Sequence, residues 1–149
     1  MNDFEANADI SRIADQLDRA VERRDLDAVV DLFSDDCVVT LFGIKLSGKE
    51  ALKRAFQSVY DRLEDVRFET ITIMSDDSTL FEEFRLHATS PKGESVSIDA
   101  VEVLEFRGSK VIGMRLYLDR LQLASVVAEG VLERKLLEAI ERKSRDGIE

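Results

Sequence analysis

The sequence has one cysteine, one histidine and no tryptophan in 149 residues. Cys37 therefore has no partner for an internal disulfide, and a zinc site built from several cysteines is excluded. We expect Cys37 to be a small buried hydrophobe. No apolar run approaches the length of a membrane-spanning helix, and the first residues lack the basic and apolar regions of a signal peptide. These absences predict a soluble, cytoplasmic protein.

Basic residues are also few, with 21 Lys and Arg against 31 Asp and Glu, for a formal net charge of -10. Such a chain repels phosphate backbones and anionic membrane surfaces on average, so we expect neither nucleic acid nor a membrane as a partner. The sequence also lacks a phosphate-binding glycine loop, a His-Glu-x-x-His helix and a nucleophile elbow. No cofactor and no metal are therefore predicted.

The length of 149 residues suits a single domain, 1–149, with 120–146 as a helical extension at its end. Apolar residues recur at helical spacing from Ile10 to Val21, which predicts a first amphipathic helix. Asp25 is a candidate cap for a short second helix that includes Phe33 and ends near 34–36. A third helix is predicted behind a Ser47-x-x-Glu50 capping box.

Between and after these helices the pattern is that of strands. A first strand is predicted over 37–41, and period-two alternation then predicts strands over 67–75, 79–90, 95–107 and 111–119. The breaks between these four strands hold Asp, Ser, Pro and Gly, which favour turns, so we expect a meander of antiparallel hairpins. Helices first and strands later indicate the α+β class. Helical spacing returns after Arg120, with Gly130 as a candidate interruption.

Three stretches of the sequence carry a family resemblance, namely Asp25–Cys37, Phe42–Leu52 and Val103–Ile112. In this order and at these separations they resemble the nuclear transport factor 2-like superfamily, with its SnoaL-like and ketosteroid isomerase-like branches. The resemblance spans about 10–127. It implies a cystatin-like cone, in which three N-terminal helices pack on a strongly curved antiparallel sheet, here with an extra C-terminal helix. It further implies an apolar pocket at the open end of the cone and, in many members, a homodimer.

Most of the catalytic residues of these relatives do not carry over to this chain. The general base of ketosteroid isomerases falls at Leu41, and their three tyrosines fall at Leu17, Phe33 and Phe56. The Arg-x-Asp motif of limonene epoxide hydrolases reads Arg85-x-His87 here, and the base in their last strand falls at Leu116. Neither named chemistry is therefore predicted.

One acidic position matches. Glu102 aligns with the acid that ketosteroid isomerases keep protonated as an oxyanion donor. That acid is a well-known example of a carboxyl group kept neutral at pH 7 by an apolar site. If Glu102 faces the pocket, strand alternation also turns Glu82 of the preceding strand inward. Glu102 and Glu82 are thus the candidate catalytic residues. A register slipped by one residue would move both acids to the other face and bury Val101 and Val103 instead.

The same register predicts the residues that bind the substrate. They are Leu17, Phe33, Leu41, Phe56, Phe84, Leu86, Ala100, Met114, Leu116 and Leu118. His87 falls outside this pocket, where a surface or interface role is the simpler reading. Asp119 is either an acid-base residue, as in polyketide cyclase relatives, or a helix cap, and capping is the simpler role.

Two functions are compatible with these residues. The first is a pocket that binds a small hydrophobic molecule, without catalysis. The alternative is a cofactor-independent acid-base enzyme of the isomerase, cyclase or hydrolase type, acting on a hydrophobic carbonyl or polycyclic substrate. The outer sheet face mixes apolar and paired polar groups, which predicts a homodimer through it. That face holds Arg85, His87, Asp99, Val101, Val103, Arg115 and Tyr117.

Overall fold

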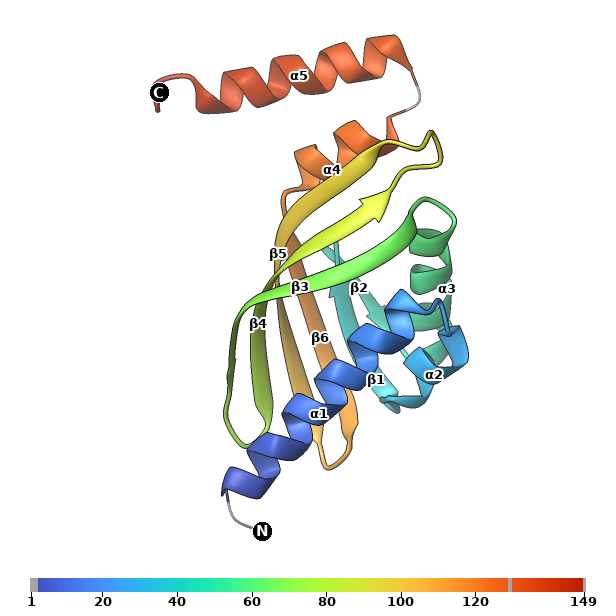
Figure 1. The fold of residues 1–149 in the computed structure, drawn as a ribbon, viewed down its shortest axis with the longest axis vertical. Helices are drawn as coiled ribbons and strands as arrows, with labels where there is room; N and C mark the ends of the chain where they lie inside the picture. Colours follow the sequence, from blue (N-terminus) through green and yellow to red (C-terminus); the bar gives the residue numbers. More distant parts are fainter. Residues whose placement is uncertain (1–2, 129, 149) are drawn as a thin grey trace.

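The computed structural model describes residues 3–128 and 130–148. In chain order its elements are α1 (Asp3–Glu22), α2 (Leu26–Asp31), β1 (Phe33–Leu41), β2 (Ile44–Ser47), α3 (Lys49–Tyr60), β3 (Glu64–Ser75), β4 (Thr79–Thr89), β5 (Ser95–Arg107), β6 (Lys110–Leu118), α4 (Arg120–Val127) and α5 (Val131–Arg145). Figure 1 shows a strongly curved sheet with α1 across one face, α2 and α3 beside it, and α5 set apart from the sheet. The predicted α+β cone is confirmed.

The six strands form one sheet in the order β2-β1-β6-β5-β4-β3. The predicted meander of β3 to β6 is antiparallel throughout, but β1 pairs with β6 in parallel. An entirely antiparallel sheet was therefore the wrong expectation at this one pair. The physical reason is the long connection from β1 to β6, which passes through α3 and four strands and can return the chain in either direction.

Strand β2 was not predicted, because its four residues are mostly exposed and carry no clear alternation. It forms a hairpin with β1, in which Leu41 pairs with Ile44 across the two-residue loop Phe42-Gly43. Both loop residues have positive φ, 53° and 78°, as a type I′ turn requires. Glycine adopts this backbone without a steric penalty, so Gly43 makes the tight turn possible.

Two of the three predicted helix caps are confirmed. The Asp25 carboxylate accepts a hydrogen bond from the Ala28 N–H (3.1 Å), and that of Asp119 accepts from Leu121 and Gln122 (3.0 and 3.1 Å). The Ser47 capping box is wrong, because Ser47 is the last residue of β2 and pairs there with Val38. Gly48 (φ 83°) is the N-cap of α3 and makes no side-chain bond.

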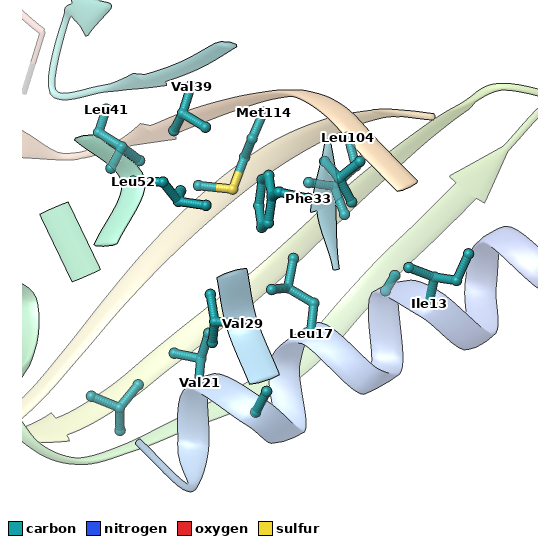
Figure 2. Packing of buried hydrophobic residues seen from close by; sticks show 14 of the residues in the cluster. Ile13, Leu17, Val21, Val29, Phe33, Val39, Leu41, Leu52, Leu104 and Met114 are labelled. Carbon is teal, nitrogen blue, oxygen red and sulfur yellow. The ribbon is translucent and has the colours of Figure 1, made fainter. Parts of the chain in front are cut away.

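The second helix also ends earlier than predicted. Helix α2 stops at Asp31, and Phe33 opens β1, where it pairs with Val111 of β6. The Phe33 ring is completely buried in the core, and Figure 2 shows it beside Met114 and Leu104, with Leu17 of α1 facing it. A buried strand residue directly after a helix produces the same apolar pattern as another turn of that helix, which explains the error.

Beyond the sheet, the C-terminal segment divides into two helices at Gly130. Leu123 and Val126 of α4 pack on the core, whereas α5 leaves Leu132, Leu136 and Ile140 exposed. The Arg134 guanidinium of α5 makes an ion pair with Glu94 (3.3 Å), which connects this helix to the β4–β5 turn. Among the described helices, none has an apolar stretch that could cross a membrane.

Candidate functional site

A cavity of about 460 Å³ lies between the concave face of the sheet and helices α1, α3 and α4. All six strands contribute to its wall, and Leu123 of α4 closes part of it, whereas no residue of α5 takes part. The C-terminal extension therefore covers the cavity with its first helix only. The wall is mainly apolar, and its acidic residues are Asp18 and Glu102.

The structure places nine of the ten predicted substrate-binding residues on this wall. They are Leu17, Leu41, Phe56, Phe84, Leu86, Ala100, Met114, Leu116 and Leu118. Phe33 is the exception, because it lies in the buried core and is not part of the cavity wall. The side-chain alternation on β4, β5 and β6 therefore agrees with the predicted register, and the slipped alternative is wrong.

Glu82 and Glu102 lie directly opposite each other on β4 and β5. Both are almost fully buried, with exposed fractions of 3% and 8%. The Thr70 hydroxyl of β3 donates a hydrogen bond of 2.6 Å to Glu82, whereas no described residue donates one to Glu102. Two like-charged residues in one cross-strand pair oppose folding when both are ionised, so this pair is not explained by stability.

Asp18 of α1 completes the group, and the sequence interpretation missed it. One carboxylate oxygen from each of Asp18, Glu82 and Glu102 lies within 4.8 Å of the other two. We call these three residues the acid cluster. A signal was available, because Asp18 lies four residues after Ala14 and three before Val21, so helical spacing puts it on the buried face of α1.

Burial controls the protonation of the acid cluster. Burial, and after it repulsion by the nearby Glu82, together raise the pKa of Glu102 to about 8. The pKa of Asp18 also rises to about 8, first because of burial and then because of repulsion by Glu102 and Glu82, with smaller effects of Glu22 and Asp15. Both residues are thus mainly neutral acids at pH 7, able to donate a proton or a hydrogen bond into the cavity.

Among the described residues, the acid cluster is also the group that could hold a cation. Three carboxylate oxygens so close together suit either a divalent metal or an organic ammonium group. His87 and Asp119 do not belong to it. His87 bonds to Glu69 (2.7 Å) on the outer face, and Asp119 caps α4. Cys37 is buried in the core, as expected.

A model of the SnoaL-like domain matches residues 13–114 of the chain, which therefore belongs to this family. No curated protein matches it. A nuclear transport factor 2-like protein of unknown function from Burkholderia pseudomallei has a similar structure, with a TM-score of 0.75 at 15% identity over 81% of this chain and 98% of that one.

Two further solved structures are similar. A protein with a ketosteroid isomerase-like fold from Catenulispora acidiphila, in complex with trimethylamine, gives a TM-score of 0.70 at 14% identity, over 77% of this chain and 91% of its own. SalBIII, an epoxide hydrolase/cyclase-like enzyme in pyran ring formation in the polyether salinomycin, gives 0.66 at 20% identity, over 75% and 92%. Likenesses at these identities show the fold.

Proposed function

We propose that this protein binds a small hydrophobic molecule in its cavity and holds a polar group of that molecule against the acid cluster. The observation that carries this proposal is the combination of an apolar cavity of about 460 Å³ with the buried Glu102 carboxyl, which faces the cavity without a described hydrogen-bond donor. Ligand pockets are typically apolar with a few convergent polar groups. A stability role alone would favour a neutral apolar residue at this position.

Filling the cavity tests this proposal. Ala55 lies on the cavity wall and Gln57 lies on the exposed side of the same helix, α3. The neutral fluorescent probe N-phenyl-1-naphthylamine should bind the wild type and Gln57→Trp with equal affinity. Ala55→Trp should weaken its binding by at least about tenfold, because an indole occupies the space. Equal binding by all three proteins would contradict the proposal. Native mass spectrometry of the purified wild type would then identify any natural occupant.

One observation favours a second function, acid-base catalysis on the bound molecule. Glu102 and Asp18 have pKa values near 8, close to the pH at which a general acid is most effective. A neutral Glu102 could protonate a carbonyl or ether oxygen of the bound molecule, and the carboxylate that this leaves could take a proton back from the substrate later in the reaction. The likeness to SalBIII, described as an epoxide hydrolase/cyclase-like enzyme, supports this alternative.

Catalysis and simple binding differ in what Glu102→Gln does. The amide keeps the shape and can still donate a hydrogen bond, but it cannot transfer a proton. An enzyme should therefore lose at least about 100-fold in turnover of its substrate with little change in KM. A binding protein should release the molecule unchanged in both forms, as mass spectrometry of incubated mixtures would show.

A further inference from the structure

No basic residue in the described part of the chain forms an ion pair with the acid cluster. Within residues 3–128 and 130–148, the salt bridges include none to Asp18, Glu82 or Glu102, and the Thr70 hydroxyl is the one described donor to the group. Arg62 is the only basic residue on the described cavity wall. Its guanidinium donates to the carbonyl (3.0 Å) and the hydroxyl of Ser58. Buried carboxyl groups are normally hydrogen-bonded or paired with a base. Glu102 lines the cavity and has neither partner among the described residues, which points to a ligand.

The geometry of the cluster indicates what kind of cation fits. Three oxygens that lie within 4.8 Å of one another leave a central point no more than about 2.8 Å from each of them. That distance is typical of charge-assisted N–H···O hydrogen bonds. A primary ammonium group carries three N–H donors, and the cluster offers one acceptor oxygen for each.

The surroundings of the cluster favour an organic cation over a metal ion. Calcium takes six to eight oxygen ligands, and magnesium keeps several waters, but the wall near the cluster offers Phe84 two residues from Glu82 and Ala100 two residues from Glu102. The Phe84 ring meets that of Phe68 edge to face, with 5.3 Å between centroids. Aromatic faces attract ammonium groups, and hydrocarbon walls accept the apolar part of the same molecule.

We propose that the ligand of this cavity is a hydrophobic amine, whose ammonium nitrogen binds among Asp18, Glu82 and Glu102 and whose apolar body fills the rest of the space. The inference rests on the proposed function and names the class of molecule that this function concerns. A hydrophobic amine would contact both the acid cluster and the apolar wall. A bare metal ion would use only the acid cluster, and an uncharged hydrocarbon would use only the apolar wall.

Proton release should accompany the binding of an amine. Asp18 and Glu102 hold protons at pH 7, since burial raises the pKa of each to about 8. The titratable groups that affect them are acidic on every side, with Glu22 and Asp15 on α1 and Glu82 on β4, while β3 contributes the Thr70 hydroxyl. An arriving cation favours the ionised carboxylates, so affinity should rise between pH 6 and pH 8.5, below the pKa of the amine.

A pair of probes that differ only in charge tests the proposal. We would titrate the full chain with 4-phenylbutylamine and with 4-phenylbutan-1-ol by calorimetry at pH 6.5, 7.5 and 8.5, in two buffers of different ionisation enthalpy. The amine should bind at least about tenfold more tightly than the alcohol at pH 7.5. Its affinity should rise with pH, and the difference between buffers should report proton release. The affinity of the alcohol should not change with pH.

Substitutions test whether the acid cluster causes the preference for the amine over the alcohol. Glu102→Gln should cut the affinity for the amine at least about tenfold and change that for the alcohol less than about threefold. Glu83→Gln, the adjacent position on the outer face of β4, should change neither. Equal affinities for the two probes in the wild type would overturn the amine proposal and leave the hydrophobic pocket intact. Binding of neither probe would contradict the proposed function itself. Stabilisation by magnesium or calcium chloride, with no response to the amine, would identify a metal site and overturn the amine.

Discussion

Two cross-strand pairs of β4 and β5 lie three residues apart along each strand but on opposite faces of the sheet. On the outer face the Arg85 guanidinium binds both oxygens of Asp99, at 2.6 and 3.3 Å, in a bidentate ion pair. On the inner face Glu82 lies opposite Glu102, buried and with no described basic partner. The outer pair follows the usual rule for stable sheets and the inner pair breaks it. Departures of this kind are expected at functional sites.

The largest expected effect is on the pH dependence of stability. The pKa of Glu102 is about 8 in the folded chain, above its ordinary value of 4.5. Between these values the folded state binds more protons than the unfolded state, so wild-type stability falls as the pH rises. Glu102→Gln removes this loss. We expect the variant to exceed the wild type by on the order of 3 kcal/mol at pH 8.5 and to match it near pH 5, as measured by urea unfolding.

The outer pair provides the control with the opposite sign. The hydrogen bond from Arg85 lowers the pKa of Asp99, so this carboxylate stabilises the fold above its ordinary pKa and loses that effect as the pH falls. Asp99→Asn should therefore be less stable than the wild type at pH 8.5, with the difference vanishing in acid. A Glu102→Gln curve parallel to the wild type from pH 5 to 8.5 would show that Glu102 is solvated.

The second prediction concerns the association of two chains through the outer face. Its exposed apolar residues include Met74 and Phe81, which pair across β3 and β4, and Val101 and Tyr117, which pair across β5 and β6. We propose that they form a homodimer contact, so light scattering at micromolar concentration should give twice the chain mass. Phe81→Glu should raise the dissociation constant at least about tenfold by placing a charge in this contact.

Leu136→Glu is the matched control, because Leu136 of α5 is also a large exposed apolar residue but lies away from the sheet. It should leave the dimer unchanged. A dimer that is lost in Leu136→Glu and kept in Phe81→Glu would place the contact on α5 instead. A wild-type monomer at these concentrations would remove the proposal altogether.

The smallest expected effect concerns the support of the acid cluster. Thr70→Val removes the hydroxyl that donates to Glu82 and leaves a buried carboxyl group without a described donor. We expect a loss of about 1 to 2 kcal/mol in the free energy of unfolding at pH 7. Thr72→Val, two residues along β3 and exposed like Thr70 but not bonded to Glu82, should cost less than about 0.5 kcal/mol. Equal losses would mean that the hydrogen bond of Thr70 does not support Glu82.

Local chemistry in the sequence was enough to predict most of the elements. Strand β5 has the predicted bounds, and the Asp25 and Asp119 caps depend on residues two or three positions away in the chain. The errors arose where one short segment fits two structures. Phe33 continues the apolar pattern of α2 yet begins β1. Ser47 has the spacing of a capping box with Glu50, yet it is the last residue of β2 and pairs with Val38 of β1.

For the site, the sequence by itself determined that Glu82, Phe84, Ala100 and Glu102 share one face of the sheet, because alternation turns them to the same side. The structure decided that this face is the inner one. Only the tertiary structure decided that Asp18 joins them. Helical spacing puts Asp18 on the buried side of α1, but the point where that helix crosses the sheet depends on packing among distant residues. The raised pKa values follow from the same packing, since burial and the approach of three carboxyls from separate elements produce them.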